Sequence, residues 1–127
     1  MHVREATADD ADALVALADD ELDGARLVRD RTVRVAENDD GVAGFVAFDT
    51  WRGAVHVTRL DGDPDAVGEL LDAPRQFAAG EDLPVEAVLV EGDALGDVLV
   101  DAGFEDVGPG PMFDGEQTRR YRLPVDD

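Results

Sequence analysis

The spacing of apolar residues divides the chain into strands and helices, beginning with one of each. Residues 2–6 read as a short strand, and Thr7 follows as the cap of a helix. The apolar residues of that helix recur on one face at helical spacing, and they are Ala11, Leu14, Val15, Ala18 and Leu22. Residues 23–30 form a connector or a second short helix. The pattern therefore predicts an amphipathic helix packed on a sheet.

Two tight turns predict three consecutive antiparallel strands in the middle of the chain. Residues 32–37 alternate like a strand, and the sequence Asn-Asp-Asp-Gly at 38–41 is a strong hairpin turn before a strand over 42–49. A second turn, at residues 51–53, leads into a strand over 54–60. These strands are expected to lie side by side in sequence order.

Residues 61–71, Asp-Gly-Asp-Pro-Asp-Ala-Val-Gly-Glu-Leu-Leu, mark the end of a strand and the start of a helix. In α/β folds such a junction often holds phosphate groups, because the first backbone N–H groups of a helix have no partner within it. Here the segment carries three aspartates and two glycines, Gly62 and Gly68. The position of this segment suits a phosphate group, whereas the negative charge of its aspartates opposes phosphate binding.

The rest of the apolar pattern predicts a divided helix, a central strand, another helix and a final hairpin. A helical stripe runs from Val67 to Ala78, and Pro74 should kink or divide that helix because proline lacks a backbone donor. Residues 85–90 are nearly all apolar, as in a central parallel strand buried on both faces. The last predicted elements are a helix over 93–102 capped by Gly103, and strands over 104–107 and 118–123 joined by a proline-containing loop.

With 127 residues and a hydrophobic fraction of 44%, the chain is expected to form a single domain, residues 1–127. Its formal net charge is −20, and all eleven basic residues are arginine. Molar salt shortens the Debye length to about 3 Å and removes most of the self-repulsion of such a surface, which resembles proteins of extreme halophiles. The alternative is an acidic face that binds a cationic partner, but the aspartates are spread along the whole chain.

Composition also excludes several classes of function. Nucleic acid and membranes are poor partners for so acidic a chain. The chain lacks cysteine and serine and has two histidines, His2 and His56, which argues against disulfides, Ser or Cys nucleophiles and a Cys- or His-rich metal site. No metal cofactor is therefore expected. The sequence has no secretory segment and no apolar run of membrane-spanning length, so a cytoplasmic location is expected.

The predicted order of elements resembles the GNAT (N-acetyltransferase) superfamily over nearly the whole chain, as a member of haloarchaeal type. Residues 1–14 resemble its opening strand and helix, residues 40–48 its second hairpin, and residues 102–108 the end of its last helix and the following strand. The resemblance implies an α/β fold with a mixed, mostly antiparallel sheet of about six to seven strands. That sheet would be splayed at its centre and flanked by three to four helices.

In this superfamily, a loop of the type Arg/Gln-x-x-Gly-x-Gly/Ala after the fourth strand binds the pyrophosphate of acetyl-CoA. Here residues 65–69 are shorter, lack the leading Arg or Gln, and include Asp65 and Glu69, so the loop is a degenerate form. The resemblance still implies acetyl-CoA as co-substrate, bound by the backbone around Leu60, Asp61, Gly62 and Gly68. The tyrosine that members often use to protonate the departing thiolate is replaced here by Leu99, which also fits a buried helical stripe.

Two side chains are candidates for the catalytic proton acceptor. His56 lies on the strand that the resemblance places beside the cofactor, and imidazole titrates near neutral pH. Its alternative role is that of a hydrogen-bonded strand histidine, since the sequence shows no carboxylate partner for it. Asp49, at the end of the preceding strand, is the second candidate and is otherwise a surface residue. Tyr121, the one tyrosine, is expected to have a packing role.

Arginines and a tryptophan provide further candidates. The arginines suit a carboxylate or phosphate ligand, or internal ion pairs with the many carboxylates of the chain. They form two clusters: Arg26, Arg29, Arg31 and Arg34 in the first, and Arg119, Arg120 and Arg122 in the second. Trp51, in a turn, is either a platform for a ligand or the lid of the core.

Two functions of different classes follow from the resemblance. The first is an N-acetyltransferase that moves an acetyl group from acetyl-CoA to a small-molecule or protein amine. The second is a catalytically inactive GNAT-fold module that has lost acetyl-CoA binding and serves in binding, regulation or assembly. The edge of the final hairpin would allow a homodimer in either case.

Overall fold

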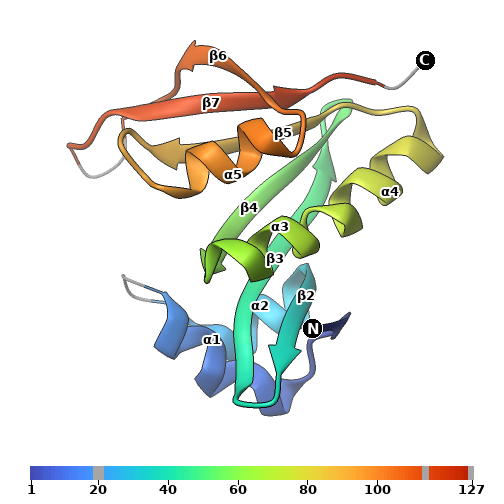
Figure 1. Cartoon of the computed structure of the whole chain (residues 1–127). Helices are drawn as coiled ribbons and strands as arrows, with labels where there is room; N and C mark the ends of the chain where they lie inside the picture. Colours follow the sequence, from blue (N-terminus) through green and yellow to red (C-terminus); the bar gives the residue numbers. More distant parts are fainter. Residues whose placement is uncertain (19–21, 113–114, 126–127) are drawn as a thin grey trace.

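The computed structural model describes residues 1–18, 22–112 and 115–125 (Figure 1). Seven strands within these residues form one sheet in the order β1-β2-β3-β4-β5-β7-β6, antiparallel except for the β4–β5 pair. The strands are β1 (His2–Glu5), β2 (Thr32–Asn38), β3 (Gly41–Trp51), β4 (Ala54–Gly62), β5 (Val85–Val90), β6 (Glu105–Pro109) and β7 (Thr118–Leu123). The predicted mixed, mostly antiparallel α/β sheet is confirmed.

Helices cover both faces of the sheet. Those of the described residues are a 3₁₀ turn, η1 (Ala8–Asp10), and the α-helices α1 (Ala11–Leu17), α2 (Gly24–Asp30), α3 (Pro64–Leu70), α4 (Asp72–Glu81) and α5 (Leu95–Asp101). Successive residues of β3 point to opposite faces, so Phe45 packs in a cluster with α1 and α2 while Val46 packs in one with α3, α4 and α5. In Figure 1, α3 and α4 follow each other along the sheet, and α5 lies over its other half.

Pro74 divides the central helix as predicted. Proline at this position cannot donate a hydrogen bond to the carbonyl of Leu70, and its ring crowds that carbonyl. Accordingly α3 ends at Leu70 and α4 begins at Asp72. The predicted end of α5 is also confirmed, because Gly103 has a φ of 101° and the N–H of Phe104 bonds back to the Leu99 carbonyl at 3.0 Å.

The structure differs from the expectations for the first helix and for β5. The first helix ends at Leu17 and not at Leu22, and Val15, which was placed on its buried face, is 44% exposed. In β5, Val88 and Val90 are 42% and 36% exposed, although the strand was expected to be buried on both faces. The layer formed by α1 and α2 packs on β2 and β3, so it leaves one face of the other half of the sheet uncovered.

Smaller differences concern strand ends and the last loop. β4 extends to Gly62, two residues beyond its predicted end, and β6 runs from Glu105 to Pro109. Residues 113–114 of the predicted loop lie outside the described residues. Across the part of the chain that the structure describes, no helix combines the length and apolar character needed to cross a membrane.

Candidate functional site

β4 and β5 start as a parallel pair and then separate. Their pairing joins residues 55–57 of β4 to residues 85–87 of β5, although β4 continues to Gly62 and β5 to Val90. Figure 1 shows the two strands diverging toward their carboxyl ends. We refer to this region, residues 58–62 of β4 and 88–90 of β5, as the β4–β5 divergence. It confirms that the sheet is splayed at its centre.

The hydrogen-bond phase of the β3–β4 ladder determines which amides face the divergence. The N–H of Asp63 bonds to the Ala43 carbonyl at 2.9 Å, and Gly62 pairs with Gly44 in the register. Because alternate residues of an antiparallel strand bond to the same neighbour, the N–H groups of Leu60 and Gly62 point away from β3. They point into the β4–β5 divergence, where β5 no longer pairs with β4. Both residues are among the predicted cofactor-binding residues.

A β-bulge accompanies the separation of the strands. Ala47 pairs with Arg59 and Phe48 with Val57, which leaves Thr58 as an extra residue in β4. Its hydroxyl donates to the Ala47 carbonyl at 3.2 Å. A bulge bends its strand and increases the local twist, so Thr58 provides a physical cause for the departure of β4 from β5. Sequence analysis missed it, because bulges have no strong local signature in non-glycine residues.

Gly62 permits the close approach of β3 and the end of β4, which pair through Gly44 and Gly62. Its φ of 130° lies in the region that favours glycine. A Cβ atom there would lie 2.5 Å from the Ala43 carbonyl oxygen and would overlap the Cα of Gly44. Gly68, the other glycine of the predicted site, lies within α3, and a Cβ on it would approach Val98 of α5 at 3.9 Å. Its contribution to cofactor binding stays a prediction.

His56 lies beside a carboxylate that the sequence did not reveal. Glu86 of β5 faces it directly in the parallel register, with 3.8 Å between His56 Nε2 and Glu86 Oε2. His56 Nε2 is also 3.1 Å from the Trp51 carbonyl oxygen, and Glu86 lies 3.8 Å from a guanidinium nitrogen of Arg122. His56 precedes Val57, the last residue of β4 that pairs with β5, so this cluster borders the β4–β5 divergence.

The other polar candidates make contacts within the protein. Asp49 lies at the surface, where it pairs with Arg31 at 3.0 Å. Trp51 is 59% exposed, so it does not close the core, and the Arg52 guanidinium stacks 4.4 Å from its ring centroid. Most arginines of the two predicted clusters make ion pairs with neighbouring carboxylates; these are Arg26, Arg29, Arg31, Arg34, Arg119 and Arg122.

The leucine that replaces the acid tyrosine of the superfamily and the one tyrosine of the chain are both buried. Leu99 is fully buried in the core, as its helical stripe predicted. Tyr121 is 8% exposed, and burial raises the pKa of its hydroxyl above 10.0. Its hydroxyl lies against the first turn of α5, where a Cβ on Gly96 would be 2.5 Å away. Among the described residues, no three histidine or acidic side chains gather where they could hold a metal ion.

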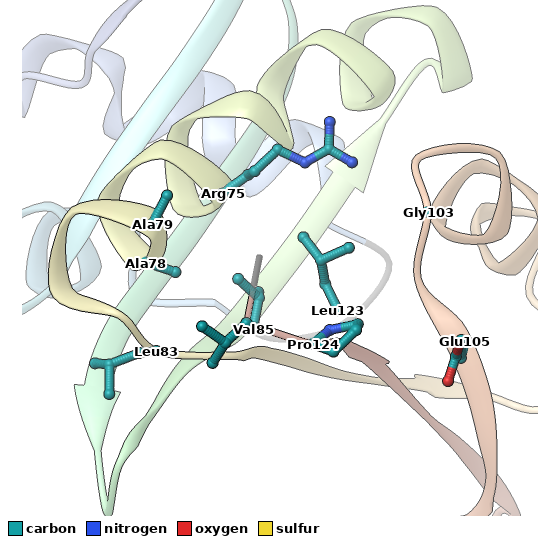
Figure 2. A pocket seen from close by; sticks show the side chains of 10 residues that line it. Arg75, Ala78, Ala79, Leu83, Val85, Gly103, Glu105, Leu123 and Pro124 are labelled. Carbon is teal, nitrogen blue, oxygen red and sulfur yellow. The ribbon is translucent and has the colours of Figure 1, made fainter. Parts of the chain in front are cut away.

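A cavity of about 430 Å³ lies at the opposite end of α4 from the β4–β5 divergence (Figure 2). Ala78 and Leu83 line it from the end of α4, and Leu123 lines it from the end of β7. Arg75 projects over it and donates a hydrogen bond to the Ala102 carbonyl at the end of α5. The cavity is thus formed between helix and strand ends, away from the predicted site residues.

Comparison with solved structures identifies this architecture. An acetyltransferase of the GNAT family from Bacillus cereus ATCC 10987 matches with a TM-score of 0.75 at 17% identity, over 99% of this chain and 98% of that chain. The ribosomal-protein-alanine N-acetyltransferase from Brucella melitensis matches with a TM-score of 0.76 at 18% identity, over 98% and 100%. The Salmonella typhimurium protein yncA, solved with its cofactor acetyl-CoA, matches with a TM-score of 0.77 at 17% identity, over 100% and 95%.

All three neighbours are named as acetyltransferases, the first of them as one of the GNAT family, and this chain has the same fold, the GNAT fold. No protein-family model matches the sequence, and neither does any curated protein. At these identities the likeness concerns the fold, so the chemistry must be argued from the residues of this chain.

Proposed function

We propose that the chain transfers an acetyl group from a thioester of the acetyl-CoA type to an amine, at the β4–β5 divergence. One observation carries the proposal: the N–H groups of Leu60 and Gly62 point into the divergence, which begins beside the His56–Glu86 pair. The extended, amide-bearing arm of acetyl-CoA fits such an edge, because it can bond to exposed backbone groups as an added strand does. The Salmonella typhimurium neighbour, which was solved with acetyl-CoA, supports the choice of donor.

Each residue of the site has a part in this proposal. Acetyl-CoA supplies the activated acetyl thioester when it is bound. The backbone amides of Leu60 and Gly62 hold and orient the donor. His56 accepts the proton of the attacking amine, and Glu86 positions the imidazole. The uncovered face that includes Val88 and Val90 admits the acceptor.

The acceptor is proposed to be a small-molecule or protein amine. Glu86 is a partly buried carboxylate on the face from which an acceptor would approach, so it would attract an ammonium group at short range. A cytoplasmic location remains a prediction of the sequence, as does a homodimer formed through the edge strand β6.

A thermal-shift experiment in molar KCl separates the two functions left open by the sequence. A ligand that binds the folded chain raises its melting temperature by mass action, so millimolar acetyl-CoA should raise it by several degrees. An unchanged melting temperature would contradict the transferase proposal. It would instead favour the inactive binding, regulatory or assembly module.

Two variants then test the role of His56, since the chain has two histidines. The His56→Gln variant should lose about a hundredfold in the rate of thiol release with an amine acceptor found by screening. It should retain the thermal shift with acetyl-CoA. The matched control is His2→Gln, at an exposed position of β1, which should keep full activity.

A further inference from the structure

We infer that the donor site recognises the S-acyl pantetheine end of its substrate and does not bind a nucleotide diphosphate. This inference rests on the proposed function and deepens it, because it defines the donor class as acyl-pantetheine thioesters. Two independent observations at the start of α3 support it: the hydrogen-bond partners of the backbone amides and the charge of the surrounding side chains.

The amides that would cradle a diphosphate are already used within the protein. The N–H of Asp63 bonds to the Ala43 carbonyl at 2.9 Å, and Pro64 has no N–H. The side chain of Asp63 caps the helix by accepting from Asp65 N at 3.1 Å, while Val67 N bonds to the Asp63 carbonyl at 2.9 Å. Residues 63–67 all lie within the described part of the chain, and Ala66 is the one residue among them whose N–H group is not accounted for in this way. Ala66 has no exposed surface.

Packing explains why that last amide is inaccessible. A Cβ on Gly44 of β3 would lie 3.2 Å from the Ala66 side chain and 3.3 Å from Leu70, so the strand and α3 are in close contact. A phosphate could reach the Ala66 amide only if α3 separated from β3. Such a movement would expose Leu70, which is fully buried.

The side chains around the same turn oppose an anion. Four carboxylates follow Arg59 within eleven residues: Asp61, Asp63, Asp65 and Glu69. Arg59 lies 3.2 Å from Asp61, so its guanidinium is engaged with a carboxylate. A diphosphate would therefore meet net negative charge as well as occupied amides, whereas the uncharged pantetheine arm meets neither obstacle at Leu60 and Gly62.

Calorimetric titration in molar KCl with three probes tests the inference: acetyl-CoA, S-acetylpantetheine and 3′-phospho-ADP. The two thioesters should bind with dissociation constants that agree within about threefold, and the nucleotide should give no binding heat. If acetyl-CoA binds more than about tenfold tighter than S-acetylpantetheine, or if 3′-phospho-ADP binds, the inference is wrong while the proposed function stands. If neither thioester binds, both fail.

A charge variant provides a second, matched test. The double variant Asp63→Ser, Asp65→Asn keeps a helix-capping oxygen and removes two negative charges. It should tighten acetyl-CoA binding about threefold and leave S-acetylpantetheine binding unchanged. Asp12→Asn, in the first turn of α1, should change neither affinity. Equal changes for both thioesters, or no gain for acetyl-CoA, would overturn the electrostatic part of the inference.

Discussion

Glu86 lies directly across the β4–β5 pair from His56, with its carboxylate 3.8 Å from the imidazole, where the strands begin to separate. The Glu86→Gln variant should lower kcat about tenfold, because the imidazole loses the carboxylate that positions it. The KM for the thioester should stay unchanged, since the donor is held by backbone amides. Steady-state kinetics with both substrates varied provides the measurement.

The control for this variant is Arg122→Gln, which removes the other partner of Glu86 and leaves the His56–Glu86 pair in place. It should retain most of kcat. A Glu86→Gln enzyme with wild-type kcat, or with a raised KM and unchanged kcat, would show that Glu86 does not act through His56.

Replacing Gly62 should destabilise the fold, because the backbones of β3 and β4 approach closely at this residue. The Gly62→Ala variant is expected to lose about 3 kcal/mol of unfolding free energy through the positive φ and the overlap with Gly44. Gly80→Ala is the matched control: nothing lies near its new Cβ in α4, and alanine favours a helix. Chemical denaturation in molar KCl measures the stability of both variants, and equal stabilities would show that Gly62 is not required for the close approach of the two strands.

Asp10 should make folding stability depend on acid pH. Hydrogen bonds from Arg4, at 2.9 Å to each carboxylate oxygen, and from the Thr7 amide lower the pKa of Asp10 from 3.8 to about 2. A lowered pKa in the folded state means that the stabilisation is complete above about pH 4 and is lost as the pH falls toward 2. Asp10→Asn should therefore be less stable than the wild type by about 1 to 2 kcal/mol at neutral pH, and the gap should shrink in acid.

This difference is best followed by denaturant unfolding at several pH values in molar KCl, which screens the remaining carboxylates. The exposed neighbour Asp9 provides the control, because Asp9→Asn removes a charge from the same turn without removing the contact to Arg4. A gap between wild type and Asp10→Asn that stays constant down to pH 2 would contradict the assignment.

Tyr121 should titrate at unusually high pH. Burial raises the pKa of its hydroxyl above 10.0, and the ultraviolet absorbance of tyrosinate reports this residue alone because the chain has one tyrosine. Since the folded state keeps the proton longer than the unfolded state, stability should fall as the pH rises above about 10. A titration midpoint at or below 10 would show that the ring is more exposed than in the structure.

Local signals in the sequence predicted most of the elements. The turns at residues 38–41 and 51–53, Pro74 between α3 and α4, and Gly103 after α5 each act through the backbone conformation of a few residues. The exposure of Val88 could not be predicted in this way. It depends on how far α1 and α2 reach across the sheet, which is a property of the tertiary packing.

The role of the predicted site residues stays a prediction, but the structure shows how strand pairing arranges them. Leu60 and Gly62 were chosen by resemblance, and the ladder phase shows that their amides face the β4–β5 divergence. The partner of His56 was missed because Glu86 is thirty residues away along the chain and becomes its neighbour through parallel pairing. Parallel strands are joined by long crossovers, so their register has no short-range signature.

Amide chemical shifts of Leu60 and Gly62 test the central claim most directly. In a nitrogen-15 NMR titration with S-acetylpantetheine in molar KCl, we expect the resonances of these two amides to shift progressively and that of Gly80, on the exposed side of α4, to stay unchanged. Binding through the backbone of β4 must change the hydrogen bonding of these N–H groups. Unchanged Leu60 and Gly62 resonances at millimolar thioester would contradict the claim that the β4–β5 divergence holds an acyl donor.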